Sequence, residues 1–458
     1  MPSAIFVLFG ATGDLARRMV LPAFAALAAA DLMPENWVLV GNGRKPQDDA
    51  WFADHVREVL DDEEQFAALR DHLMFAGNGF TADDPGDLPD TIARARKRAG
   101  DSEDDPAELV HYIALPPSTF EPYVRALDAH GLAAGARVVF EKPYGTSPEA
   151  FAHLEEVVHG VLDEDQVYRL DHFLGKEATQ NLHVLRFANR IVGDIWCNAG
   201  VAQVEIDAPE TLDIDDRAEF YDATGATLDM VVTHLFQVAA EIAMEAPATL
   251  GGADLLAARE SVIACFRPLD PDEVVLGQYD GYRDVKGVAR DSATDTFIAA
   301  RLWVDTDRWR GVPFLLRTGK RLAVSEQRVT LVLKPPTDCP LPDAPPAAIS
   351  LSLKGSGELD ITVIAKRPGP EIALEAGTAP LPLSHNGGPD LPAYATLIRD
   401  VLEGDRSLFT SSEGLDAAWR VLAPLLANRP EVQRYPQGSW GPEAAAELAG
   451  PAGWHLQR

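Results

Sequence analysis

A short apolar segment, a glycine-containing turn and a long segment rich in Ala and Leu open the chain, and this order constrains the fold most. Ala4–Phe9 is β-rich and stops at Gly10, whereas Asp14–Met33 has the length and composition of a helix. Asn36–Val40 is a second short apolar run. Strand, helix and strand within about 40 residues predict a βαβ unit, whose right-handed crossover requires a parallel sheet.

Two further short apolar runs extend this predicted sheet. Leu109–Leu115 and Arg137–Phe140 read as buried strands, and Ser118–Ala129 between them reads as a helix. We therefore expect residues 1–168 to form an α/β, doubly wound, Rossmann-like domain that binds a dinucleotide.

The second part of the chain has a different period. Val329, Leu331 and Leu333 share one face, with Thr330 and Lys334 on the other, and in 349–354 apolar residues alternate with polar ones. This period of two predicts strands with one covered face. The glycine-containing segment 354–358 predicts a hairpin into 359–363. A chain of 458 residues exceeds the size of one core, so residues 169–458 are expected to form a separate α+β domain with a large, mainly antiparallel sheet.

The charge balance excludes some partners. Acidic residues outnumber basic ones 71 to 40, and the net charge of −31 repels nucleic acid and anionic membranes. Three widely spaced cysteines support neither a disulfide framework nor a zinc site, and we expect no bound metal. The first apolar run has no basic flank, and no run reaches the roughly 18 apolar residues of a membrane span. A cytoplasmic protein is expected, and any anionic substrate needs a local basic cluster.

The turn after the first strand is a candidate cofactor site. It reads Gly10-Ala11-Thr12-Gly13-Asp14-Leu15, so its glycines allow close backbone approach and its amides meet a pyrophosphate at a helix N-terminus. A G-x-x-G pattern is weak by itself. The alternative is a tight turn in which Asp14 merely lies near the start of the helix.

Cations follow two of the predicted parallel strands. The second strand ends in Gly41–Lys45, which has no carboxylate for the ribose hydroxyls of NAD, whereas Arg44 and Lys45 favour the additional phosphate of NADP. Lys142 follows the strand that ends at Phe140, at the edge where open α/β sheets bind ligands. The alternatives are a common surface Arg–Lys pair and a plain strand-ending turn.

Arg169–Glu177 places Asp171, His172 and Lys176 close together directly after a strand-like run. A carboxylate, an imidazole and an ammonium in this order are suited to binding a phosphate and orienting a base. His234, by contrast, lies among apolar residues on an expected helix, and its local pattern alone is typical of a core histidine.

These segments, in this order, resemble the glucose-6-phosphate dehydrogenase family over nearly the whole chain. The matching motifs are Phe9–Ala16, Tyr112–Pro117, Phe140–Pro143, Arg169–Glu177, Leu185–Arg190, Phe314–Lys320 and Gly438–Pro442. Any one of them could arise by accident, but seven collinear matches could not.

The resemblance implies oxidation of glucose 6-phosphate to 6-phosphogluconolactone with NADP, the first step of the oxidative pentose phosphate pathway. It assigns the catalytic base to His234, its orientation to Asp171, phosphate binding to His172 and Lys176, and other sugar contacts to Glu210, Asp229 and Lys320. A base with a pKa near 7 suits this reaction because the C1 hydroxyl must lose its proton as hydride leaves.

Three positions depart from the family pattern. Phe173 replaces a usual Tyr, which removes a hydrogen bond worth about 0.5–1.5 kcal/mol. Ser325 stands where a basic residue is often found, with Arg321 or Arg328 as possible substitutes, and Thr233 replaces a common Asn.

Two alternatives to the implied activity stay open: a divergent relative acting on another sugar or sugar phosphate, and a catalytically silent NADP-binding regulatory subunit. Members of the family usually assemble as homodimers or homotetramers through the large sheet, and the resemblance implies the same assembly for this chain.

Overall fold

The computed structural model describes residues 1–102, 104, 106–214, 217–341, 343–355, 357–383 and 391–457. The chain forms two compact units. The first unit comprises Met1–Gly175, Thr249–Leu256 and Pro389–Glu413, and the second comprises Lys176–Ala248, Ala257–Gly388 and Gly414–Arg458. The sequence placed the division between residues 168 and 169, whereas the first unit continues to Gly175 and takes two later segments of the chain.

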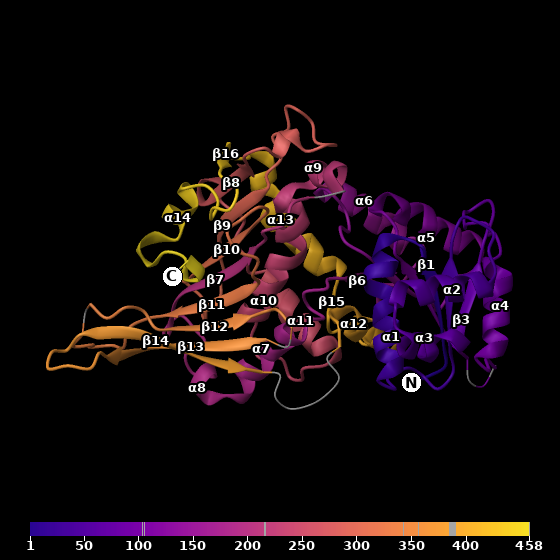
Figure 1. The fold of residues 1–458 in the computed structure, drawn as a ribbon, viewed down its shortest axis with the longest axis horizontal. Helices are drawn as coiled ribbons and strands as arrows, with labels where there is room; N and C mark the ends of the chain where they lie inside the picture. Colours follow the sequence, from indigo (N-terminus) through magenta and orange to yellow (C-terminus); the bar gives the residue numbers. More distant parts are fainter. Residues whose placement is uncertain are drawn as a thin grey trace. The chain divides into compact units, whose positions relative to one another are not determined.

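The first unit is built on a seven-stranded sheet in the order β15-β6-β5-β4-β1-β2-β3 (Figure 1). Its strands are β1 (Ala4–Phe9), β2 (Trp37–Asn42), β3 (Leu73–Ala76), β4 (Glu108–Ile113), β5 (Arg137–Phe140), β6 (Val167–Leu170) and β15 (Phe409–Thr410). All neighbours pair in parallel except β15, which is antiparallel to β6. The predicted doubly wound, Rossmann-like fold is confirmed.

Strand β1 lies inside this sheet because all of its side chains are apolar. Each of its residues from Ile5 to Phe9 is at most 1% exposed. Full burial of a large apolar side chain contributes about 1.5–3 kcal/mol. The strand pairs with β2 and β4 over its whole length, so its end is fixed relative to theirs.

The helices of the first unit connect these strands. They are α1 (Leu21–Ala29), α2 (Asp49–Leu60), α3 (Glu63–Leu69), α4 (Leu88–Arg98), α5 (Phe120–Ala129), α6 (Pro148–His159) and α12 (Ala393–Glu403). A π-helical turn, η1 (Ala16–Val20), precedes α1. The expected helix 14–33 is therefore too long. It stops at Ala29 because Asp31 is left-handed, with φ 56°, and the amide of Leu32 donates to the carbonyl of Leu27.

The second unit contains a nine-stranded sheet in the order β14-β13-β12-β11-β7-β10-β9-β8-β16. Its strands are β7 (Val201–Pro209), β8 (Val274–Tyr279), β9 (Phe297–Trp303), β10 (Pro313–Gly319), β11 (Arg328–Leu333), β12 (Ala348–Ser352), β13 (Glu358–Lys366), β14 (Leu374–Pro382) and β16 (Val432–Tyr435). Only the pairs β7–β10 and β8–β16 are parallel among these described strands. The predicted large, mainly antiparallel sheet is confirmed.

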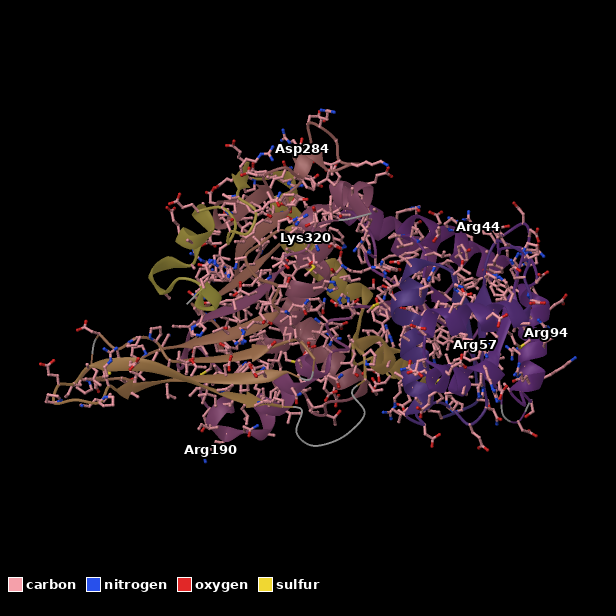
Figure 2. The ribbon with its side chains drawn as sticks, in the orientation of Figure 1. Arg44, Arg57, Arg94, Arg190, Asp284 and Lys320 are labelled. Atoms are coloured by element: carbon pink, nitrogen blue, oxygen red, sulfur yellow. The ribbon has the colours of Figure 1, made fainter. Side chains whose placement is uncertain are left out.

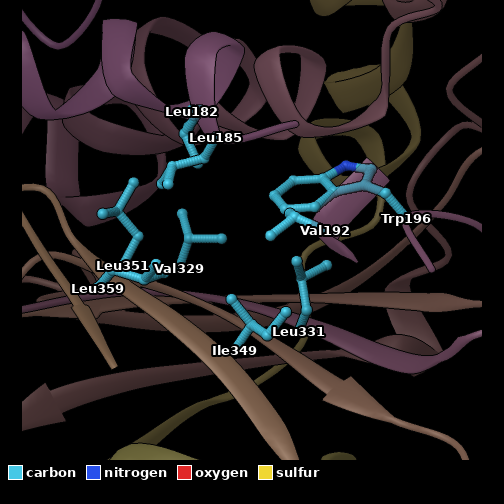
Figure 3. Close-up of a pocket in the computed structure, with 9 residues that line it drawn as sticks. All are labelled: Leu182, Leu185, Val192, Trp196, Val329, Leu331, Ile349, Leu351 and Leu359. Atoms are coloured by element: carbon cyan, nitrogen blue, oxygen red, sulfur yellow. The ribbon is translucent and has the colours of Figure 1, made fainter. Parts of the chain in front are cut away.

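The expected hairpin is present as β12 and β13, in a register that pairs Ile349 with Ile361 and Leu351 with Leu359. Helices of the second unit pack near the inner strands, and Figure 3 shows apolar side chains from α7, α8 and the sheet facing one another. The cavity between them measures about 10 Å³, which is space for about one water molecule. This part of the core is thus closely filled.

The remaining helices are α7 (Glu177–Ala188), α8 (Arg190–Gly193), α9 (Ala218–Ala226), α10 (Phe236–Ala243), α11 (Gly252–Ile263), α13 (Ser412–Ala427) and α14 (Ala444–Leu448). A π-helix, η6 (Thr227–Leu235), lies between α9 and α10. Within the described ranges, no helix combines the length and the apolar character needed to cross a bilayer.

Asp400, near the end of α12, generates a prediction about stability. Burial, followed by repulsion from Asp405 and Glu403, raises the pKa of its carboxyl to about 7. Because the folded pKa lies above the unfolded value of about 4, the folded state loses stability as pH rises from about 4 to 7. Asp400→Asn should therefore raise the thermal midpoint at pH 8 and change it little at pH 4.

Calorimetry at the two pH values measures this difference. Asp54→Asn is the matched control, because the Asp54 side chain is 74% exposed on α2. An equal effect of Asp400→Asn at both pH values would contradict the assigned cause.

Candidate active site

The turn between β1 and the first helix is compatible only with glycine at its first position. Gly10 has φ +76°, and a Cβ there would lie 2.7 Å from the carbonyl oxygen of Ala114. The amide of Gly13 donates to the carbonyl of Gly10 at 2.8 Å, and the amide of Ala11 donates to the carbonyl of Asn42 at 3.3 Å. The turn is thereby tied to the end of β2. Its close backbone approach fits the pyrophosphate of a dinucleotide.

The other predicted residues of this turn lie at the start of the helical segment. Thr12 is exposed, and Leu15 precedes η1. The carboxylate of Asp14 forms an exposed ion pair with Arg18 at 2.9 Å. Such a pair contributes at most about 1 kcal/mol. The Asp14 carboxylate therefore lies at a helix N-terminus and also pairs with an exposed arginine.

Arg44 lies just beyond the end of β2, in the same unit as the turn (Figure 2). Parallel pairing of Phe9 with Asn42 places the two strand ends side by side. Asn42 is buried, and its amide donates to the carbonyls of Ala76 and Gly79 at 3.1 and 3.3 Å. These bonds hold the following loop, so the exposed Arg44 has a defined backbone position near the candidate phosphate site.

A buried carboxylate precedes Lys142. Glu141 is 6% exposed and accepts a hydrogen bond of 2.6 Å from the hydroxyl of Tyr112. Burial raises the pKa of Glu141, and hydrogen bonds from Tyr112 and Tyr394 oppose that rise. This cluster was not predicted from the sequence, because its members lie on β4, directly after β5 and on α12, and no local pattern links them.

The motif after β6 is folded tightly onto itself. Asp171 is 2% exposed, and its carboxylate accepts a hydrogen bond of 2.9 Å from the amide of Phe173. The ring of His172 stacks on Tyr394, with 6.3 Å between centroids, and meets the edge of Phe173 at 5.0 Å. The Phe173 ring is buried beside the imidazole, so it keeps the packing role of an aromatic residue without a hydroxyl.

In the second unit, Glu210 and Lys320 are brought together by parallel pairing. Pro209 at the end of β7 is opposite Gly319 at the end of β10, so the next residue of each strand emerges at the same edge. Lys320 Nζ and Glu210 Oε2 are 2.6 Å apart. An ammonium donates hydrogen bonds and a carboxylate accepts them, so the two groups together are chemically suited to a hydroxylated ligand.

Tyr221 joins this cluster and was not predicted from the sequence. The ammonium of Lys320 is 5.7 Å from the centre of its ring. Burial, followed by the negative charge of Asp229, raises the pKa of Tyr221 well above its usual value. A neutral phenol thus lies near two predicted substrate residues, and an isolated Tyr on a helix carries no sequence signal for that position.

His234 lies in the π-helix η6 and is fully buried. The amide of Phe236 donates to the carbonyl of Val231, as in a π-helix. Such helices are rare and occur frequently at functional sites. The hydroxyl of Thr233 donates to the carbonyl of Asp229 at 3.2 Å, so this substitution is accommodated on the helix itself. His234 and Asp171 belong to different units, and their pairing stays a prediction.

The suggested substitutes for a basic residue at Ser325 already have carboxylate partners. Arg321 pairs with Asp213, and Arg328 pairs with Asp360 at 2.6 Å. The hydroxyl of Ser325 accepts a hydrogen bond of 2.8 Å from the amide of Thr211.

Two lysines lie close to this segment. The ammonium of Lys354 donates to the carbonyl of Ser325, and that of Lys176 donates to the side-chain oxygen of Gln327. Lys354 therefore places positive charge beside the position where the family often has a basic residue.

A Rossmann-like unit with a glycine turn, followed by an α+β unit with a charged cluster at the edge of its sheet, is the architecture of a two-domain nicotinamide-dependent dehydrogenase. The comparisons with known proteins identify its family. The model of the glucose-6-phosphate dehydrogenase NAD binding domain matches residues 7–181, and that of the C-terminal domain matches residues 183–455. The chain belongs to the glucose-6-phosphate dehydrogenase family.

Individual relatives agree over almost the whole length. Glucose-6-phosphate 1-dehydrogenase 1 of Mycobacterium tuberculosis is 35% identical over 99% of this chain and 96% of its own. A crystal structure of glucose-6-phosphate 1-dehydrogenase from Mycobacterium avium is 33% identical, with a TM-score of 0.86 and 99% coverage of both chains. A structure of glucose-6-phosphate dehydrogenase in complex with its substrate glucose-6-phosphate is 25% identical, with a TM-score of 0.90, covering 99% of this chain and 98% of that one.

The position of Arg44 generates a prediction about the cofactor. A cation that binds the additional phosphate of NADP contributes about 1.5–3 kcal/mol. Arg44→Ala should therefore weaken NADP binding roughly ten- to hundred-fold and leave NAD binding nearly unchanged, as measured by titration calorimetry. Lys45 can replace part of the contact, so the double variant should show the larger loss.

Arg94→Ala is the matched control, since Arg94 is an exposed arginine of the same unit on α4. Equal weakening of both cofactors by Arg44→Ala would assign Arg44 a structural role instead.

Proposed function

We propose that this chain oxidises D-glucose 6-phosphate to 6-phospho-D-glucono-1,5-lactone with NADP, the entry reaction of the oxidative pentose phosphate pathway. The observation that carries the proposal is the family match over residues 7–455, together with the presence of the matching substrate motif at Asp171, His172 and Lys176. The related structure that contains glucose-6-phosphate agrees with the choice of substrate.

The first unit supplies the cofactor site. NADP, when bound, supplies the acceptor for the hydride that leaves C1 of the sugar. Gly10 allows the turn to pack against the backbone of Ala114, and the amides of the turn would hold the pyrophosphate. Arg44 provides the charge for the additional phosphate, and Lys142 follows a strand of the same parallel sheet. The residues present therefore fit the cofactor.

His234 acts as the general base. Its imidazole takes the proton of the C1 hydroxyl, the electron pair of that O–H bond forms the lactone carbonyl, and the electron pair of the C1–H bond leaves as hydride. Asp171 holds the other ring nitrogen and stabilises the imidazolium. The buried position of His234 excludes water from the base.

The phosphate and the hydroxyls are bound by separate groups. His172 and Lys176 bind the phosphate, because a chain with a net charge of −31 must supply its cations locally. Glu210, Asp229 and Lys320 bind the sugar hydroxyls. The ion pair of Lys320 with Glu210 holds both side chains in place before substrate arrives.

The decisive experiment is reduction of NADP by the purified chain with glucose 6-phosphate as the sole substrate. The same assay with glucose and other hexose phosphates separates this function from that of a divergent sugar dehydrogenase. Rapid reduction with another sugar and none with glucose 6-phosphate would contradict the proposal. Absence of activity with every sugar would favour a silent regulatory subunit.

His234→Asn should lower the turnover number by about 100- to 10,000-fold, the usual contribution of a general base. Binding of glucose 6-phosphate, measured by calorimetry without cofactor, should persist. His111→Asn provides a control for loss of a buried histidine, because His111 lies on β4 of the first unit and its imidazole bonds to the carbonyl of Leu132. A near-normal turnover number for His234→Asn would remove the base assignment.

We also propose that the enzyme is cytoplasmic and forms a homodimer or homotetramer through its large sheet. Val363 on β13 and Leu381 on β14 are 53% and 50% exposed, an apolar surface that a second copy would cover. Light scattering of the full chain should give two or four times 49.6 kDa, and a monomer mass would contradict assembly.

A further inference from the structure

A second cavity, with charged side chains in its lining, is found in the second unit at the end of the nine-stranded sheet formed by β8 and β16. Its volume is about 580 Å³, within the range of small-molecule sites. Its charged lining residues are Arg283, Arg429, Arg434 and Glu431. Asp284, labelled in Figure 2, marks the loop that carries Arg283. Three guanidinium groups around one cavity are notable in a chain whose acidic residues outnumber its basic ones 71 to 40.

The arginines reach the cavity from different parts of the chain. Arg283 follows β8, Arg429 follows α13, and Arg434 lies on β16. The parallel register of β8 and β16 pairs Arg434 with Gln278. Among the residues that the structure describes, neither Arg283 nor Arg434 has an ion pair. Their positive charge is therefore available to a ligand.

Arg429 is held in place by a buried carboxylate. It pairs with Asp295, which is completely buried and also accepts hydrogen bonds of 2.8 and 2.7 Å from the amide and hydroxyl of Thr227. The ion pair with Asp295 uses one guanidinium nitrogen of Arg429, and an arginine has five N–H donors. One cation of the cavity is thus oriented in advance, which lowers the entropy lost on binding.

Gln278 adds a requirement that a simple anion does not meet. It lines the cavity, is 1% exposed, and its Nε2 donates to the carbonyls of Ser292 and Thr294 at 3.2 and 2.9 Å. Its Oε1 is buried without a hydrogen-bond partner in the described part of the chain. The two donated bonds fix the amide orientation, so this oxygen needs a donor. A ligand with a hydroxyl group supplies one.

We propose that this cavity, distinct from the substrate and cofactor residues above, binds a small organic phosphate that carries hydroxyl groups. The three arginines bind the phosphate, for which planar guanidinium groups are suited. The Gln278 oxygen accepts a hydrogen bond from a ligand hydroxyl. Glu431 lies at the same cavity and disfavours ligands whose whole surface is anionic.

Glycerol 3-phosphate is the probe, and its binding to the full chain is measured by titration calorimetry at low salt. Arg283→Ala combined with Arg434→Ala should weaken this binding at least ten-fold. The control combines Arg290→Ala with Arg310→Ala, which removes the same charge from residues that do not line the cavity. Loss of binding in both double variants, or in neither, would overturn the proposal.

Lys176→Ala separates this cavity from the proposed substrate phosphate site. Glycerol 3-phosphate should still bind to the Lys176→Ala variant. Loss of its binding in Lys176→Ala, with binding retained in the Arg283/Arg434 double variant, would contradict the proposal. Neither result depends on catalytic activity. Inorganic phosphate, which lacks an alcohol hydroxyl, should bind roughly two- to ten-fold more weakly than glycerol 3-phosphate. Equal affinities would remove the role of Gln278.

Discussion

Parallel pairing of strands decides where most of the side chains proposed for the site of this chain lie. Parallel neighbours end at the same edge of a sheet, so residues that follow them meet although they are distant in sequence. In the first unit this relation places the Gly10 turn beside the end of β2. In the second unit it places Lys320 against Glu210, within a sheet that is otherwise mainly antiparallel. The catalytic proposal depends on both of these pairings.

Because the chain is acidic overall, the partner of each cationic side chain indicates whether that side chain is structural or available to a ligand. Arg317 is completely buried, pairs with Asp207 at 2.6 Å and lies against the rings of Trp440 and Trp454. Removing one partner of such a pair costs about 3–5 kcal/mol, so this arginine is structural. The exposed Arg44 differs, because in the described part of the chain no ion pair holds its side chain. The same distinction separates Arg434 from the arginines of the core.

The departures from the family pattern are accommodated locally. Phe173 packs against the His172 ring, and Ser325 bonds the amide of Thr211 while Lys354 lies close by. These contacts are compatible with the family's activity. The substitutions at Phe173 and Ser325 alone therefore do not indicate a different substrate.

The sequence by itself determined the elements whose apolar pattern is unambiguous, including β1 at Ala4–Phe9, β5 at Arg137–Phe140 and the β12–β13 hairpin. It identified the roles proposed for His234 and the other site residues only through family resemblance, because a buried histidine on a helix carries no chemical signal of its own. Only the tertiary structure decided that residues 389–413 return to the first unit, that Tyr221 lies near Lys320 and that three arginines share one cavity. Local propensity reports which element a segment forms, whereas these contacts depend on pairing between segments far apart in the chain.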